Sequence, residues 1–403
     1  MNNCKIAIAG IGVVGTNVLD YIINNAEFLT LKCNNQKPTI TAISTRSERQ
    51  YKNITWHNNP LKMLEDESTD IFIELIGGAD GIAYDFIYAA LVKGKNVITA
   101  NKALIAKHGT KLFALAQQNN CCLYFEAAVA GAVPIIKILH DNLSGNKISE
   151  IYGILNGTCN FILSEMERNG VSFAEVLKLA QEKGFAEADP TLDIEGTDAA
   201  HKIAILSAIA FNTEINFASV EIKGISNMKN ASFKIAHELG YSIKLLAKSS
   251  LNNGKINHYV RPFMVNKQYP IASVNNALNS VYIKSDLALD TILTSHGAGG
   301  NPTASSIIAN ICDITRNNKQ FFPNINNYDY VKYANLEQKF LIYFSDTEQY
   351  NLCKELFNEH NISYQHKSNK ANKYTLIFST KELNKIEKII DKLNYMDLFE
   401  LYE

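Results

Sequence analysis

The sequence predicts a protein of the α/β plus α+β class in three parts: a doubly wound parallel sheet, a central α+β domain and a small C-terminal βαββαβ unit. Short apolar runs alternate with helix-like segments in the first third of the chain, as in parallel sheets joined by helical crossovers. Longer helices follow from about residue 134, and a new strand-and-helix pattern ends the sequence. At 403 residues, 46% of them hydrophobic, the chain can bury more than one core.

The N-terminal part opens with an apolar run over residues 5–9, a glycine-rich turn and an amphipathic stretch over 16–24. This order of strand, turn and helix is the start of a βαβ unit. Further strands are expected at 39–43, 71–76, 96–99 and 122–126, and further helices at 84–93 and 109–118. We therefore expect a nucleotide-binding domain over residues 1–134.

The central part, residues 135–295, mixes longer helices with strands. Helices are predicted at 157–169, 172–183 and 197–210, and strands at 219–223, 242–248, 258–265 and 288–295. A following helix that runs to Asp313 could return to cover the first sheet. The nucleotide-binding domain would then be discontinuous and completed by residues 296–325.

The C-terminal part, residues 335–403, follows a polar stretch at 316–333. Its apolar patterns predict elements in the order βαββαβ at 339–344, 348–360, 362–367, 374–378, 381–393 and 398–402. Such a unit is either a regulatory module or a dimerisation module, and the order of its elements is the same for both functions.

Charge and cysteine content exclude several classes of function. Lysine and arginine total 39 against 40 acidic residues, with no basic run, so we expect no nucleic-acid partner and favour a small-molecule substrate. The seven cysteines form no CxxC pair, which indicates neither a disulfide framework nor a zinc site. The longest apolar runs are too short to span a membrane, and the first residues do not resemble a signal peptide, so a cytoplasmic protein is expected.

The glycine-rich turn predicts a dinucleotide site, formed by Gly10, Ile11, Gly12, Val13, Val14 and Gly15. Glycines at this spacing allow a tight turn, close approach of a pyrophosphate and packing of the helix on the strand. The second strand ends in Ser44, Thr45 and Arg46, without the carboxylate that holds the ribose of NAD. Arg46 therefore favours NADP as the cofactor, with NAD as the alternative cofactor. The alternative role of Arg46 is that of a solvated loop residue that contacts no cofactor.

A charged segment over residues 180–202 is the most informative part of the sequence. Asp198 and Lys202 stand at i and i+4 of a predicted helix, so they share a face and can pair. The helix continues almost wholly apolar through residues 203–210, which indicates that its first turn enters a cleft. A solvated charge cluster is the alternative interpretation.

The spacing A-x3-G-F-x3-D-P-x2-D-x2-G-x-D-x3-K, from Ala180 to Lys202, resembles the signature of the homoserine dehydrogenase family. The resemblance covers about residues 1–325 and includes segments 10–15, 74–78, 99–102, 126–134, 156–160 and 297–300. It implies a Rossmann domain and NAD(P)-dependent interconversion of L-homoserine and L-aspartate 4-semialdehyde, on the route to threonine and methionine. It also implies a homodimer or homotetramer.

Roles for individual residues follow from the resemblance. It makes Lys202 the acid/base at the reacting oxygen, and Asp198 the group that orients Lys202 or binds beside it. It places Glu187, Asp193 and Lys102 at the substrate, with Glu187 receiving the substrate ammonium. Besides residues 10–15 and Arg46, it assigns four residues to cofactor binding: Gly77, Thr99, Lys102 and Gly299.

The resemblance also implies a site for a monovalent cation, sodium or potassium. The matching positions are Glu126, Val129, Gly131 and Val133. The chain departs from the glycine-rich form of this loop at Ala130 and Ala132. It also has Cys159 where a threonine is common, either as an exposed, oxidation-sensitive thiol or as a buried, inert one.

Many members of the family carry a C-terminal ACT domain, and residues 335–403 resemble one by element order. The loop from Phe344 to Tyr350 lacks the glycine that ligand-binding ACT loops use, so threonine feedback and structural pairing both stay open. The sequence leaves two alternatives to this enzyme. An aspartate-semialdehyde dehydrogenase would need an activated cysteine, which the sequence does not offer. A catalytically inactive dinucleotide-binding sensor would lack the Asp198–Lys202 pair.

Overall fold

The computed structural model describes residues 3–318, 325–333, 336–344, 346–366, 374–391, 393, 395 and 397–402. It divides into two compact units. Unit 1 comprises Met1–Ile151, Ala204–Ala218 and Val281–Asn327, and unit 2 comprises Tyr152–Ile203, Ser219–Ser280 and Tyr328–Glu403. The expected domain limits at residues 134, 295 and 335 stay predictions, and residue 335 lies outside the described residues.

The sheet of unit 1 has six parallel strands in the order β3-β2-β1-β4-β5-β6. These are β1 (Asn3–Ala9), β2 (Lys37–Ser44), β3 (Thr55–His57), β4 (Ile71–Glu74), β5 (Asn96–Thr99) and β6 (Leu123–Tyr124). The chain reverses its direction of progress between β1 and β4, as in doubly wound nucleotide-binding sheets. The predicted parallel sheet is confirmed. Folds of this kind bind ligands at the carboxyl ends of the strands where the order reverses, which are here β1 and β4.

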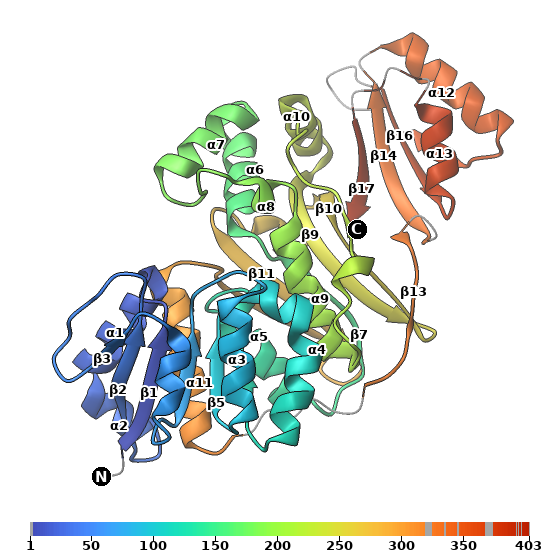
Figure 1. The fold of residues 1–403 in the computed structure, drawn as a ribbon. Coiled ribbons are helices and arrows are strands. Elements are labelled where there is room, and N and C mark those ends of the chain that lie inside the picture. Colours follow the sequence, from blue (N-terminus) through green and yellow to red (C-terminus); the bar gives the residue numbers. More distant parts are fainter. Residues whose placement is uncertain are drawn as a thin grey trace. The chain divides into compact units, whose positions relative to one another are not determined.

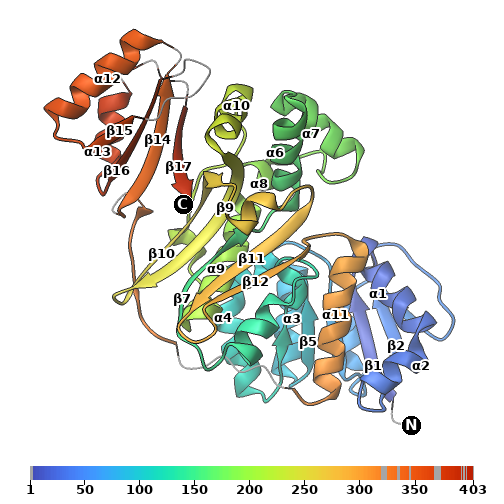
Figure 2. The same cartoon turned by 180° about the vertical axis from the view of Figure 1, so that it is seen from behind.

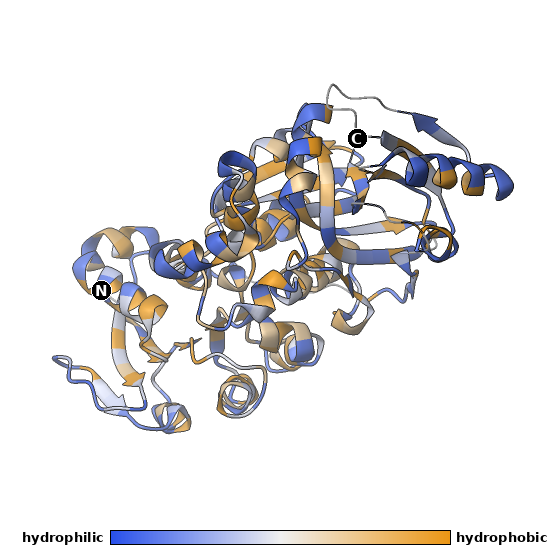
Figure 3. Cartoon of the chain, turned by 90° about the horizontal axis from the view of Figure 1, so that it is seen from above, coloured by the Kyte–Doolittle hydropathy of each residue, from blue (hydrophilic) through white to orange (hydrophobic). Residues whose placement is uncertain are grey.

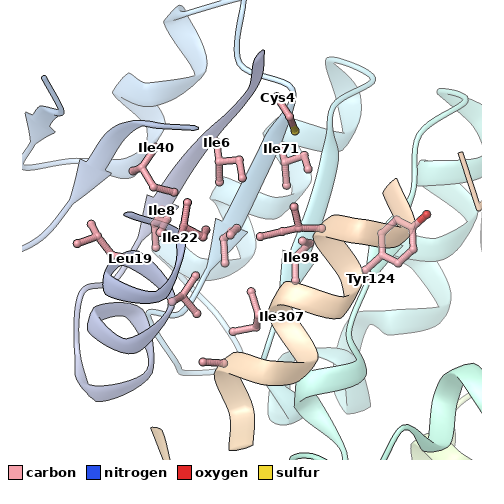
Figure 4. Close-up of a cluster of buried hydrophobic side chains, with 14 of the residues drawn as sticks. Cys4, Ile6, Ile8, Leu19, Ile22, Ile40, Ile71, Ile98, Tyr124 and Ile307 are labelled. Atoms are coloured by element: carbon pink, nitrogen blue, oxygen red, sulfur yellow. The ribbon is translucent and has the colours of Figure 1, made fainter. Parts of the chain in front are cut away.

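Helices of unit 1 cover this sheet (Figure 1). They are α1 (Val13–Asn24), α2 (Ala26–Lys32), α3 (Ile82–Val92), α4 (Lys102–Gln118) and α11 (Gly300–Thr315). Although α11 is distant in sequence, it packs against α1 and adds Ile307 to the buried cluster that contains Ile6, Ile8 and Leu19 (Figure 4). Unit 1 also contains β12 (Asp290–His296) and the short helices η1 (Pro60–Glu65), η2 (Glu126–Ala128), α5 (Ile135–Lys137) and η3 (Ile138–Asn142).

The start of α4 differs most from its prediction. α4 begins at Lys102, not at residue 109, because the Asn101 side chain accepts a hydrogen bond from the Leu104 backbone N–H (3.1 Å) and caps the helix. Gly109 lies inside this helix, where a Cβ would lie 2.7 Å from the Ile215 side chain. The glycine therefore allows close packing and does not start the helix.

Unit 2 is built around the antiparallel hairpin of β9 (Tyr241–Asn252) and β10 (Lys255–Asn266). The short strands β8 (Glu221–Ile222) and β13 (Asp329–Tyr330) also pair with β10. Helices α6 (Gly157–Asn169) and α10 (Asn230–Leu239) pack on β9, and α6 also contacts α7 (Phe173–Glu182) and α8 (Thr191–Ile194). The predicted α+β character is confirmed. Four elements have residues in both units: β7 (Ile148–Ile154), α9 (Thr197–Phe211), η4 (Phe217–Ser219) and β11 (Leu278–Ser285).

The C-terminal part of unit 2 has the predicted βαββαβ order (Figure 2). Its elements are β14 (Gln338–Phe344), α12 (Thr347–Glu359), β15 (Tyr364–His366), β16 (Tyr374–Thr380), α13 (Leu383–Ile390) and β17 (Asp397–Tyr402). β17 pairs with β14 on one side and runs parallel to β10 on the other, so these strands continue the sheet of the hairpin. Residues 367 and 392, which the expected strand and helix included, lie outside the described residues.

Several surface helices carry hydrophobic residues on their buried side. Figure 3 shows helices that carry hydrophilic and hydrophobic residues together, as amphipathic surface helices do. In α13, for example, Leu383, Ile386 and Ile390 are buried. Within the described part of the chain, no helix is both long and apolar enough to cross a membrane.

Candidate active site

The predicted Asp198–Lys202 pair forms at the start of α9. The Lys202 ammonium lies 2.7 Å from Asp198 Oδ2, and the two residues are only 7% and 5% exposed. Lys202 Nζ also donates to the backbone carbonyl of Leu155 (2.7 Å). The pair is therefore buried, which rules out the interpretation as a solvated surface cluster. An ammonium has three N–H donors, and these two contacts use two of them.

Asn156 holds the carboxylate side of this pair. Its Nδ2 donates both to Asp198 Oδ2 (2.8 Å) and to Asp193 Oδ1 (2.7 Å). Its Oδ1 accepts from the Cys159 backbone N–H (2.7 Å), which caps α6. One buried amide thus ties the start of α6 to carboxylates of α8 and α9. Asn156 lies in the segment 156–160 of the family resemblance, but no sequence spacing predicts this bridging role.

The other charged positions of this segment lie closer to solvent. Glu187 is exposed in the connection between α7 and α8, and its backbone carbonyl accepts from the Gln181 side chain (3.2 Å). Asp193 is half-buried on α8, with Oδ1 already bonded to Asn156. Glu187 therefore offers its carboxylate to the solvent, whereas Asp193 is partly engaged in holding Asn156.

Of the two alternatives for Cys159, an exposed oxidation-sensitive thiol or a buried inert one, the structure shows the buried thiol. It is fully buried, and its thiol donates to the Asp193 carbonyl (3.1 Å). Burial, and then the nearby carboxylates of Asp193 and Asp198, raise the pKa of this thiol well above its usual range. Since a thiolate is the reactive form, this cysteine stays protonated and unreactive. All seven cysteines are buried as free thiols.

The glycine-rich turn of unit 1 has the geometry of a dinucleotide site. Gly10 has a φ of +99°, and a Cβ there would lie 2.5 Å from the Leu75 carbonyl. A Cβ on Gly15 would lie 2.1 Å from the Gly10 carbonyl, so this glycine lets α1 pack on the turn. Gly12, the N-cap of α1, has no atom within 4 Å of its Cβ position. Open space at a helix N-terminus suits a phosphate group.

Two further cofactor positions lie after β4 and β5. Gly77 has a φ of +84° in the loop after β4. Thr99, at the end of β5, is fully buried; its hydroxyl donates to Glu74 (2.6 Å) and accepts from the Asn101 backbone N–H (3.0 Å). Asn101 in turn donates to the Gly78 carbonyl (2.6 Å). Thr99 therefore fixes the two loops at the carboxyl edge of the sheet.

The remaining predicted cofactor residues lie at element ends. Arg46 is exposed, two residues after β2 ends. Lys102 is half-buried at the first position of α4. Gly299 is the N-cap of α11 with a φ of +116°, and a Cβ on the next residue, Gly300, would lie 2.4 Å from Asn17 on α1. The N-termini of α1 and α11 are therefore neighbours.

Comparison with known proteins decides the family. Residues 10–126 match the model of the homoserine dehydrogenase NAD-binding domain, and residues 134–312 match the homoserine dehydrogenase model. The homoserine dehydrogenase of Neisseria gonorrhoeae is 41% identical over 320 residues, which are 78% of this chain and 73% of that protein. That of Bacillus subtilis is 34% identical over 79% of this chain and 74% of its own length. The chain belongs to the homoserine dehydrogenase family.

Solved structures agree with this assignment. A homoserine dehydrogenase from Thiobacillus denitrificans has a TM-score of 0.92 at 33% identity and covers 100% of this chain and 99% of its own. A hyperthermophilic archaeal homoserine dehydrogenase in complex with NADPH has a TM-score of 0.68 at 25% identity, covering 80% of this chain and 100% of its own. Homoserine dehydrogenases are oxidoreductases that act on a CH–OH group with a nicotinamide cofactor. The alternative of an inactive sensor finds no support in these comparisons.

The loop that the homoserine dehydrogenase resemblance assigns to a cation lies in unit 1. Glu126 is 2% exposed, and its two carboxylate oxygens accept the backbone N–H groups of Ile136 and Lys137 (2.9 Å each). Burial raises the pKa of Glu126 to about 7. Ala130 and Gly131 both have a φ of +57°, which an alanine rarely adopts.

The rest of this loop is tied to neighbouring backbone. Ser306 donates to the Gly131 carbonyl (2.7 Å), and the Ala132 N–H donates to the His296 carbonyl (3.0 Å). The N–H of Val133 donates to the Ala130 carbonyl, and that of Val129 donates to the Glu126 carbonyl. Carbonyl oxygens and one carboxylate are the donor types that a hard monovalent cation would need.

Proposed function

We propose that this homoserine dehydrogenase interconverts L-homoserine and L-aspartate 4-semialdehyde, with NADP preferred over NAD, in threonine and methionine biosynthesis. One observation carries the assignment of its acid/base. Lys202 is buried, paired with Asp198 and bonded to the Leu155 carbonyl, which leaves one N–H direction for a substrate oxygen. General acid–base catalysis needs a group held within hydrogen-bond reach of the oxygen whose proton moves.

In the direction of reduction, the Lys202 ammonium donates a proton to the aldehyde oxygen as that oxygen gains charge. In oxidation, neutral Lys202 accepts the proton of the homoserine hydroxyl. The bound nicotinamide cofactor supplies or accepts the hydride. Asp198 and the Leu155 carbonyl fix the direction of the Lys202 N–H bonds, and Asn156 holds Asp198 in turn. Because lysine must first lose its own proton, oxidation favours alkaline pH.

The substrate's charged α-amino group needs a carboxylate, and we assign this role to Glu187. Its exposure supports the assignment, because a carboxylate already buried in an ion pair would be unavailable. Asp193 and Lys102 complete the proposed substrate contacts, from α8 and from the N-terminus of α4.

Cofactor selectivity is assigned to Arg46. Its exposed position after β2, where no carboxylate follows the strand, supports a contact with the 2′-phosphate of NADP. Residues 10–15, Gly77, Thr99 and Gly299 would hold the rest of the cofactor. The open space at Gly12 fits this role. A preference for NADH over NADPH greater than about tenfold, equivalent to about 1.4 kcal/mol, would contradict the assignment to Arg46.

A sodium or potassium ion is assigned to Glu126 and the backbone carbonyls of Val129, Gly131 and Val133. The buried Glu126 carboxylate supports this, since a cation would compensate a charge that burial destabilises. We further propose a cytoplasmic homodimer or homotetramer. For the C-terminal part, threonine sensing by an ACT-like domain and pairing between subunits remain the two candidate roles.

The test of the acid/base role measures loss of NADPH absorbance with L-aspartate 4-semialdehyde. Lys202→Ala should lower kcat by about 10²- to 10⁴-fold, the usual contribution of a general acid. Lys178→Ala is the matched control, because Lys178 is an exposed lysine of α7 in the same unit. Activity of Lys202→Ala within about tenfold of the control would remove Lys202 from this role.

A further inference from the structure

The Leu155 carbonyl, which accepts a hydrogen bond from Lys202, has a second donor. Asn279 Nδ2 donates to the same oxygen at 3.0 Å, and Lys202 Nζ donates at 2.7 Å. A carbonyl oxygen has two lone pairs, so these two donors use both of them. Asn279 is the second residue of β11, which neighbours β7 in the sheet, and Leu155 directly follows β7 (Figure 2). Lys202 therefore shares its backbone acceptor with a side chain that is distant along the chain.

Stability alone does not explain an amide at position 279. Asn279 is 0% exposed, and among the described residues none donates a hydrogen bond to its Oδ1. A buried amide oxygen without a donor destabilises a fold, whereas an apolar side chain of similar shape avoids this cost. The Leu155 carbonyl would still have Lys202 as a donor if the amide were absent. The bond that Asn279 makes is thus offset by the acceptor that it leaves unpaired.

The backbone that carries Asn279 is fixed by side chains of α6 and β9. Asn160 on α6 donates to the Val274 carbonyl (3.1 Å) and to the Leu278 carbonyl (3.2 Å). The buried ammonium of Lys244 on β9 donates to the same Val274 carbonyl (2.7 Å). A residue can hold a catalytic group in place only if it is itself held by its surroundings. Asn279 meets this condition.

The connection between β7 and α6 holds both members of the Asp198–Lys202 pair. The Leu155 carbonyl accepts from Lys202, and the side chain of the next residue, Asn156, donates to Asp198. Through its bond to Leu155, Asn279 fastens this connection to β11. All five residues belong to unit 2.

We propose that Asn279 is a positioning residue for the reaction: it fixes the Leu155 carbonyl, and this carbonyl aims Lys202 at the reacting oxygen. The inference rests on the proposed acid/base role of Lys202. When the carbonyl and the Asp198 carboxylate fix two bonds of the ammonium, the direction of its third N–H is fixed as well. In neutral Lys202 the lone pair takes that third direction, so the same arrangement serves the oxidation. Misplacement of a reacting group by about 1 Å can lower a rate about 10²-fold.

The experiment replaces Asn279 with leucine and measures NADPH oxidation with L-aspartate 4-semialdehyde. Leucine keeps the branched shape and removes the donor to Leu155. We expect kcat to fall about tenfold or more, with KM within about twofold of the wild-type value, because aim is lost while substrate contacts stay. The urea unfolding midpoint should be no lower than that of the wild type, because the unpaired Oδ1 is removed together with the bond.

Asn257→Leu is the matched control. Asn257 on β10 is also buried, its Nδ2 donates to the Ser250 hydroxyl (2.9 Å), and its Oδ1 has no donor among the described residues. The substitution therefore removes an equivalent amide from the same unit without touching Leu155. Its kcat should equal that of the wild type.

A double-variant cycle separates positioning from a general structural effect. If Asn279 acts through Lys202, adding Asn279→Leu to Lys202→Ala should leave the residual rate unchanged, because the group to be aimed is already absent. A structural effect would lower the rate by the same factor in both backgrounds.

Two outcomes would overturn the inference: equal kcat in Asn279→Leu and Asn257→Leu, or an equal loss in both Lys202 backgrounds. Wild-type activity of Lys202→Ala would instead refute the acid/base role itself and remove the basis for this inference, so the two failures are distinguishable. Should Asn279→Leu fail to fold, Asn279→Ala with Asn257→Ala as its control gives the same comparison, because alanine adds no bulk to a packed core.

Discussion

Substitutions of Asn156 should separate the two ways in which it stabilises the fold: its Oδ1 caps α6, and its Nδ2 bonds to both Asp193 and Asp198. Asn156→Ser keeps a cap oxygen but removes both N–H donors to the carboxylates. Hydrogen bonds to charged groups contribute about 1.5 to 3 kcal/mol each, and half-buried Asp193 regains part of this from water, so the loss should be about 3 kcal/mol. Asn156→Ala also loses the cap, a further cost of about 1 kcal/mol.

Urea denaturation of the three proteins measures this order, and steady-state kinetics measure its effect on the site. We expect Asn156→Ser to lower kcat more than it raises KM, because the Asn156 amide donates to Asp198, which in turn orients the Lys202 ammonium. Asn156→Asp sets a third carboxylate against two others and should be the least stable at about pH 8, with partial recovery on acidification. If Asn156→Asp were as stable as the wild type at that pH, the inferred bridge would be wrong.

Three other predictions follow from local geometry. Gly15→Ala should destabilise the fold, because its Cβ would lie 2.1 Å from a backbone carbonyl oxygen. Gly12→Ala should unfold in urea like the wild type but bind NADPH more weakly in a fluorescence titration, because the space at Gly12 is open. Equal stability of the two variants would contradict this prediction. Burial raises the pKa of Glu400 to about 7, above an unfolded value of about 4.3, so its contribution to stability is complete at low pH and is lost as the pH rises through 7. Glu400→Gln keeps an acceptor for the Tyr333 hydroxyl and should therefore gain stability over the wild type at about pH 8 but not at about pH 4; a constant difference between the two would refute the sign. Ala130→Gly should raise the unfolding free energy by about 1 kcal/mol, because φ is +57° there, and a loss of stability in thermal unfolding would count against that strain.

Local periodicity was sufficient for much of this fold. The spacing of Asp198 and Lys202 predicts their contact because residues four apart on a helix share a face. The parallel sheet follows from the alternation of short apolar runs with helices, and the βαββαβ order follows from apolar patterns of the last 70 or so residues. Strand β8 is shorter than expected, Glu221–Ile222 instead of 219–223, and both of its residues are exposed.

The features that could not be predicted from the sequence depend on contacts between residues that are distant along the chain. Several elements have no counterpart in the sequence prediction, among them α2, β3, β7, α8, α10, β11 and β13. The bond between Glu74 and Thr99 joins the ends of two strands, and the bridge by Asn156 joins three helices. No spacing rule relates such positions, because their proximity arises only when the sheet and helices pack.

The parallel pairing of β10 with β17 has a consequence for synthesis of the chain. Phe263, Met264 and Val265 pair with Glu400, Leu401 and Tyr402. At typical elongation rates of about 5 to 20 residues per second, this stretch of β10 stays without its partner for about 7 to 27 s on the ribosome. An uncovered strand edge of that kind can pair with other chains, and long-range pairings also form slowly. Yield of native protein should therefore rise when the nascent chains are dilute, because the edge of β10 then meets fewer other chains before β17 is synthesised.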